Sequence, residues 1–149
     1  MKLLPLILLA FLALFSCKQK EKTAKTPEME TISPSVNTLF VSIDKNKFTQ
    51  DSDPLSIKSA KINGDILELL VCYSGGCKEH FFELVSNGFY MKSLPPKLAV
   101  KVLHNNNGDA CRSLEEKYLT FNIKDLRYPG EGPLILLIDG MKEETTYQY

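Results

Sequence analysis

Along residues 36–149, apolar and polar residues alternate in short runs, and clusters of Gly, Pro, Asn and Asp separate one run from the next. Such alternation places successive side chains on opposite faces of a β-strand, so each run predicts a strand. The expected strands cover residues 38–44, 56–62, 66–73, 80–86, 97–104, 118–123, 134–138 and 145–149. About seven to eight short strands predict an all-β fold, an antiparallel β-sandwich, with a closed β-barrel as the alternative.

Three local patterns refine this picture. Asn63-Gly64, between two of the runs, is the strongest short signal for a β-hairpin. Residues 66–73 are mostly apolar on both faces of the expected strand, so this strand should lie inside a sheet rather than at its edge. Residues 124–126 are expected to form a single helical turn.

The N-terminal segment carries a different pattern. A basic start is followed by an apolar run over residues 3–15, which is shorter than the roughly 20 residues of a membrane-spanning helix and suits a secretory signal peptide. The run ends in the sequence LFSC, which resembles the lipobox of bacterial lipoproteins. The resemblance implies that Cys17 is lipidated and becomes the first residue of the mature protein.

Residues 18–35 are rich in Lys, Gln, Glu, Thr and Pro and contain few apolar residues. Such a segment cannot bury enough apolar surface to fold, so we expect a disordered tether. The expected organisation is a signal peptide at 1–16, the lipidated cysteine and tether at 17–35, and one β domain at 36–149. Lys18 stands where lipoproteins kept at the inner membrane commonly have Asp, which favours the outer membrane.

Length and charge exclude some functions. The 149 residues correspond to one domain rather than two. Lys and Arg together number 18, as do Asp and Glu, so the formal net charge is zero. A nucleic-acid-binding protein usually shows a basic excess, so we expect no nucleic-acid partner.

The cysteines predict one disulfide. With Cys17 lipidated, Cys72, Cys77 and Cys111 remain, an odd number that allows one bridge and one leftover thiol. Export places them in an oxidising compartment. Cys77 and Cys111 lie in turn-like segments, which favours their pairing and leaves Cys72 buried and reduced. The pairs Cys72–Cys77 and Cys72–Cys111 stay open at this point.

His80 and His104 are the two histidines of the chain, and each lies at the end of an expected strand. If those strands pair, the imidazoles meet near Cys77 and Cys111, a set of ligand types that suits tetrahedral zinc. The spacing is not that of a standard zinc motif, and a Cys77–Cys111 bridge would remove both thiolates. We therefore expect no metal or other cofactor, and structural histidines that are hydrogen-bonded at strand ends.

No pattern of catalytic residues stands out. The Ser74-Gly75-Gly76 turn lacks the G-x-S-x-G sequence of a nucleophile elbow, and a disulfide would silence a Cys–His thiol dyad. We therefore expect a protein that is not an enzyme. A ligand or partner surface is expected at the backbone of Ser74, Gly75 and Gly76 and at the loop aromatics Phe89 and Tyr90.

Two blocks of sequence resemble a family. The run YSGGCKEHFF at 73–82 and a downstream block that contains Pro95-Pro96, His104 and NGDAC at 107–111 are similar to small bacterial envelope lipoproteins, loosely the NigD-like lipoproteins. The resemblance covers about residues 63–138. It implies a β-rich domain and a Cys77–Cys111 partnership, and it implies no activity.

The sequence thus favours a lipid-anchored protein of the cell envelope that acts as a non-enzymatic binding or interaction module. Its partner would be an envelope protein, a glycan or a small ligand. One alternative is a metal-binding or thiol-active domain that uses Cys77, His80, His104 and Cys111. The other is an inhibitor of an exogenous hydrolase.

Overall fold

The computed structural model describes residues 37–149. The expected signal peptide, the lipidation site Cys17 and the tether lie outside the described residues. The elements are, in chain order, β1 (Leu39–Ile43), α1 (Lys45–Phe48), β2 (Ser56–Asn63), β3 (Ile66–Gly75), β4 (Phe81–Met91), β5 (Lys97–Asn105), β6 (Ser113–Asn122), the 3-10 turn η1 (Lys124–Leu126), β7 (Leu134–Ile138) and β8 (Thr145–Tyr147). Within residues 37–149, no helix is long and apolar enough to cross a membrane.

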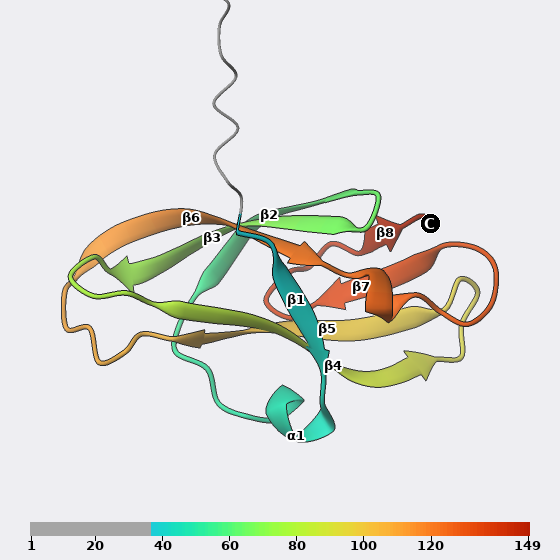
Figure 1. Ribbon diagram of the computed structural model, residues 1–149, viewed down its shortest axis with the longest axis horizontal. Helices are drawn as coiled ribbons and strands as arrows, with labels where there is room; N and C mark the ends of the chain where they lie inside the picture. The colour runs from blue at the N-terminus through green and yellow to red at the C-terminus, as the bar shows by residue number, and fades with distance from the viewer. Residues whose placement is uncertain (1–36) are drawn as a thin grey trace, which may run out of the picture. The chain divides into compact units, whose positions relative to one another are not determined.

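The eight strands form one mixed sheet in the order β2-β3-β6-β1-β4-β5-β7-β8. Its two edge strands, β2 and β8, contact each other, so the sheet curves into a nearly closed barrel (Figure 1). These features confirm the all-β fold and the expected strand number. The sheet has two facing parts, β2-β3-β6 and β4-β5-β7-β8, and β1 joins them. The fold therefore combines features of the expected sandwich and of the barrel alternative.

The direction of three strand pairs differs from the expected antiparallel arrangement. Strand β1 runs parallel to both of its neighbours, β6 and β4, and β5 runs parallel to β7. Alternation shows which residues form a strand and which face each side chain occupies, but it carries no information about strand direction. A parallel pair needs a long connection, and the chain between β1 and β4 contains the whole β2–β3 hairpin. The expectation of a purely antiparallel sheet was therefore wrong.

The β2–β3 hairpin and the η1 turn form as the sequence predicts. Gly64 in the hairpin has φ of +56°, a left-handed conformation that favours glycine. Strand β3 pairs with β2 on one side and β6 on the other, as expected for a strand that is apolar on both faces. Helix α1 was not expected; Asp44 caps it by accepting hydrogen bonds from the backbone N–H groups of Asn46 (2.7 Å) and Lys47 (3.1 Å).

The core lies between the two facing parts of the sheet. In β5, every second residue from Leu98 to His104 is buried, and the residues between them are partly exposed. On the facing strand β3, Leu67, Leu69 and Val71 are fully buried. His104 occupies the last inward position of a row that is otherwise apolar. The alternation therefore brings an imidazole into the interior at the end of the barrel where the β3–β4 and β5–β6 loops lie.

Candidate functional site

The β3–β4 and β5–β6 loops are joined covalently. Cys77 in the first loop and Cys111 in the second form a disulfide, and their Cα atoms are 5.9 Å apart. Cys72 on β3 is a free, buried cysteine. The favoured pairing is thus confirmed, and the two pairings that involve Cys72 do not occur.

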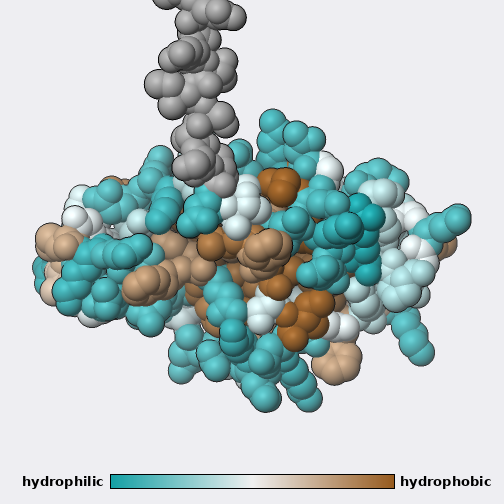
Figure 2. Space-filling model, viewed as in Figure 1, coloured by the Kyte–Doolittle hydropathy of each residue, from teal (hydrophilic) through white to brown (hydrophobic). Residues whose placement is uncertain are grey.

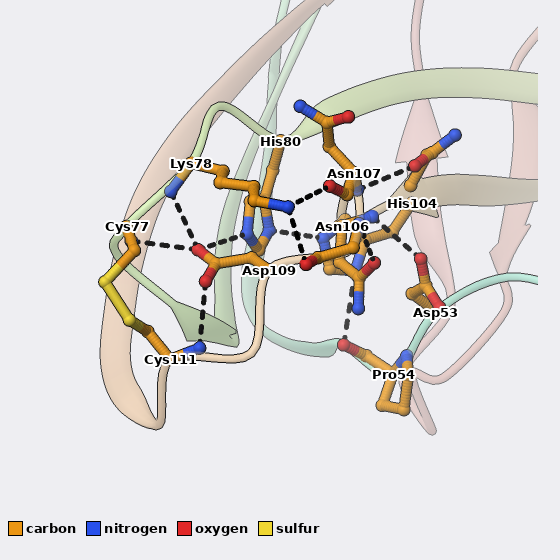
Figure 3. Close-up of polar contacts among 12 residues, drawn as sticks. Asp53, Pro54, Cys77, Lys78, His80, His104, Asn106, Asn107, Asp109 and Cys111 are labelled. Carbon is orange, nitrogen blue, oxygen red and sulfur yellow. Dashed lines mark hydrogen bonds and ion pairs between the residues drawn. A yellow bond between two sulfur atoms is a disulfide. The ribbon is translucent and has the colours of Figure 1, made fainter.

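Asp109 ties the same two loops together through hydrogen bonds (Figure 3). Its Oδ2 atom accepts from the backbone N–H groups of Cys77 and Lys78, both at 2.9 Å. Its Oδ1 atom accepts from the backbone N–H of Cys111, also at 2.9 Å. These donors, above all that of Cys111, hold the pKa of the Asp109 carboxyl well below its usual range, although burial opposes them. Because its side chain is 1% exposed, Asp109 is a buried carboxylate anion.

The two histidines extend this polar cluster into the interior. His80 Nε2 lies 3.3 Å from Asp109 Oδ2, and His80 Nδ1 lies 2.8 Å from His104 Nε2. The second ring nitrogen of His104, Nδ1, lies 3.2 Å from the backbone carbonyl oxygen of Pro54. A carboxylate, two imidazoles and a carbonyl therefore form one continuous row of contacts, which we call the histidine row.

Aromatic rings enclose the histidine row. The Tyr73 ring lies 4.7 Å from the His80 ring, and the Phe82 ring stacks on the His104 ring at 4.8 Å, with 3° between the ring planes. Burial lowers the pKa of His104, and the nearby His80 lowers it further, whereas hydrogen bonds with neighbouring backbone groups oppose this effect. This end of the core is therefore packed with aromatic and polar groups in place of aliphatic ones.

The candidate metal ligands Cys77, His80, His104 and Cys111 lie near one another but do not surround a common point. The sulfur atoms of Cys77 and Cys111 are bonded to each other, so neither is a thiolate. These sulfurs and an oxygen of Asp109 all lie within 4.8 Å of one another, and neither histidine belongs to this group. The facing nitrogens of His80 and His104 contact each other instead. In this oxidised form, the four side chains offer neither a thiolate ligand set nor a thiol–imidazole dyad.

The predicted Ser74-Gly75-Gly76 surface has a structural role at this end of the barrel. Gly75 is buried, and a Cβ atom there would lie 2.5 Å from two ring atoms of His80. Gly76 has φ of +104°, which favours glycine. Ser74 is exposed on β3. The absence of a side chain at Gly75 therefore makes room for the imidazole, and ligand binding at this turn stays a prediction.

Phe89 and Tyr90 lie toward the C-terminal end of β4, whereas Ser74 and Gly75 end β3 and Gly76 follows them, all before the first residue of β4. Phe89 is 62% exposed. Tyr90 is partly buried, and its hydroxyl donates to the carbonyl oxygens of Leu126 (3.2 Å) and Arg127 (3.0 Å). The structure therefore does not unite the five predicted surface residues in one place.

Three exposed aromatic side chains were not singled out from the sequence. Phe40 on β1, Phe81 on β4 and Tyr118 on β6 are 73%, 53% and 64% exposed, and we call these three residues the aromatic face. Figure 2 shows hydrophobic surface gathered over β1, with hydrophilic residues around it. Each of the three residues precedes an inward-facing residue of its strand. A large aromatic residue at an outward position of the alternation is therefore the sequence feature that could have indicated this surface.

A cleft of about 610 Å³ adjoins the aromatic face, between β6 and β4. Strand β1 pairs with the end of β6 and the middle of β4. In the described part of the chain, no strand therefore lies between residues 113–120 of β6 and residues 81–83 of β4. Phe81, Tyr118 and His80 all line the cleft, so the aromatic face and the histidine row are neighbours.

No protein-family model matches the sequence, and no curated protein matches it. Several solved structures are similar to this chain, among them two proteins from Bacteroides species. The first is a NigD-like immunity protein from Bacteroides caccae, with a TM-score of 0.51, 18% identity and coverage of 72% of this chain and 58% of that chain. The second is a protein of unknown function, DUF1344, from Bacteroides vulgatus, with a TM-score of 0.51, 17% identity and coverage of 75% and 55%. This chain thus spans less than two-thirds of their length, and the similarity, which agrees loosely with the NigD-like resemblance, shows a common fold.

Proposed function

We propose that the protein is a lipid-anchored interaction module of the bacterial cell envelope, without enzymatic activity, which binds a protein partner through the aromatic face. The observation that carries this proposal is the exposure of Phe81 and Tyr118, which both line the cleft, and of Phe40 on the strand β1 between β4 and β6. Figure 2 shows hydrophobic surface gathered over β1, and gathered apolar surface marks an interaction site more often than the single apolar residues that every protein surface contains.

Physical chemistry favours a protein as the partner. Aromatic side chains contribute much of the binding free energy at protein interfaces, because a partner removes a large apolar area from water. A cleft between two strands also suits an extended polypeptide, because such a segment can form backbone hydrogen bonds with a sheet edge. The zero net charge of the sequence gives no reason to expect nucleic acid.

Membrane attachment rests on the lipobox-like sequence that ends at Cys17. Several acyl chains on one residue anchor a protein stably without a spanning helix. We expect the mature N-terminal peptide to carry fatty acyl chains on Cys17, detectable by mass spectrometry. The Cys17→Ala variant should lose the acyl chains, and an unmodified N-terminal peptide in the wild-type protein would contradict the anchor.

A photo-crosslinking amino acid tests the binding surface directly. We expect a crosslinker at position 118 to capture one defined protein in the envelope, and the Phe81→Asp substitution to abolish that product because it places a charge in the interface. The matched control carries the crosslinker at Leu94, which is 99% exposed in the β4–β5 loop. Equal products from positions 118 and 94, or a product that survives Phe81→Asp, would refute binding through the aromatic face.

Inhibition of an exogenous hydrolase is the second candidate function. The observation that favours it is the description of one similar structure as an immunity protein. The same crosslinking experiment separates the two candidates, because the captured protein would then be a hydrolase from outside the cell rather than a resident envelope protein.

A further inference from the structure

We propose that His80 and His104 form a proton-binding site that holds, at about pH 7, one proton more than two neutral imidazoles, with Asp109 as its counter-ion. This site lies beside the aromatic face, but the proposal does not depend on the proposed function. It follows from the number of hydrogens that the histidine row requires.

Three contacts make up the row from Asp109 to the carbonyl of Pro54, and each contact needs one hydrogen. The carboxylate and the carbonyl at the two ends are acceptors and supply none. All three hydrogens must therefore come from the four ring nitrogens of His80 and His104. Two neutral imidazoles carry one N–H each, so they complete two contacts and leave two acceptors facing each other in the third. With one more proton, every contact has its hydrogen.

The extra proton gives the histidine pair a charge of +1, which the Asp109 carboxylate neutralises. Only His80 contacts the Asp109 carboxylate, so the positive charge belongs on the His80 side of the pair. An ion pair of this kind, buried and hydrogen-bonded at both ends, avoids an unpaired charge in the interior.

The other titratable groups around the pair are Asp53, Glu68, Tyr73, Lys78, Glu79, Glu115 and Lys117. Asp53, whose carboxylate accepts the Asn106 backbone N–H at 2.7 Å, favours a positive charge on the pair. Lys117 opposes it, but this side chain is exposed and lies on the face of Phe82. Lys78 is likewise exposed. Asp109 alone among these acids is in contact with an imidazole nitrogen, so it decides the charge of the pair.

Nitrogen-15 NMR of the folded domain counts the protons, because protonated and unprotonated ring nitrogens differ widely in chemical shift. At about pH 7 we expect the two rings together to show three protonated nitrogens. Two unprotonated nitrogens, one on each ring, would overturn the proposal.

The Asp109→Asn variant tests the counter-ion. Without the carboxylate charge, we expect the pair to drop to two protons at the same pH, whereas the exposed control Asp51→Asn should keep three. If Asp109 only holds the loops together, Asp109→Asn lowers stability but leaves three protons on the pair, and this result would overturn its assigned role. If the Asp109→Asn variant does not fold, the count on the wild-type protein still decides the proposal.

Discussion

Removal of the Cys77–Cys111 disulfide should destabilise the domain by restoring freedom to the unfolded chain. The bridge closes a loop with a sequence separation of 34 residues. The chain-entropy model gives about 3.8 kcal/mol for a loop of this length at room temperature. A domain of this size is typically stable by about 5–15 kcal/mol, so the loss is a quarter or more of the total. We therefore expect Cys77→Ser/Cys111→Ser to fold, but with a much lower unfolding midpoint.

The native loops should keep their arrangement in this variant, because Asp109 still accepts hydrogen bonds from the backbone of both loops. The loss of stability then arises in the unfolded state, because the unfolded chain without the disulfide is less compact and exposes more surface. Urea unfolding should show both a smaller free energy of unfolding and a somewhat larger denaturant dependence.

Reductant provides the control for this prediction. It should lower the stability of the wild-type domain by a similar amount and leave the double variant unchanged, since Cys72 is already a free thiol. A loss below about 1 kcal/mol, far from the chain-entropy value, would refute the reasoning. A further loss when reductant is added to the double variant would show that another disulfide carries the stability.

Two other substitutions test the packing at either end of β3. Gly75→Ala should cost about 1–3 kcal/mol in urea unfolding, because the new Cβ overlaps His80, whereas Ala at the exposed neighbour Ser74 should have little effect; equal losses at both positions would contradict the steric reading. At the other end, burial and the hydrogen bond to Asp65 raise the pKa of Tyr147 to about 12 from the ordinary 10.0. The folded state therefore holds this proton more tightly than the unfolded state, and the domain loses stability as the pH rises from about 10 to about 12. Tyr147→Phe should flatten this alkaline decline in thermal unfolding, and an unchanged slope would disprove the assignment.

The alternating pattern was enough to predict most strands and their inward faces. Strand β5 shows why: the row from Leu98 to His104 changes from apolar to polar once, at its last member, and the structure buries all of it. The parallel position of β1 was not predictable in the same way. It depends on contacts with β4 and β6, which follow much later in the chain, and no local pattern records them.

In the candidate site, too, local sequence patterns predicted some features, whereas contacts between distant segments were not predictable. The strand-end positions of His80 and His104 predicted that the rings would approach each other, and the turn positions of the cysteines favoured the bridge that forms. The carbonyl of Pro54 was not foreseeable, because a backbone acceptor in an irregular segment has no sequence signature. The aromatic face was missed because an outward aromatic residue in a strand looks, in one sequence, like any residue at the rim of a core.

The two ends of β3 are held by different chemistry, and this difference bears on how the domain responds to its surroundings. At the hairpin end, Asp65 pairs with Arg127 and accepts from Tyr147, and the Asp65 and Arg127 side chains are partly exposed to solvent. At the loop end, the side chains of Asp109 and His80 are each 1% exposed, and the disulfide joins the β3–β4 and β5–β6 loops. Loss of the bridge therefore acts on the loop end, whereas loss of the Tyr147 proton acts on the hairpin end. Because His80 and Phe82 also line the cleft beside the aromatic face, a partner bound there would contact the end of the domain that the disulfide and the histidine row hold together.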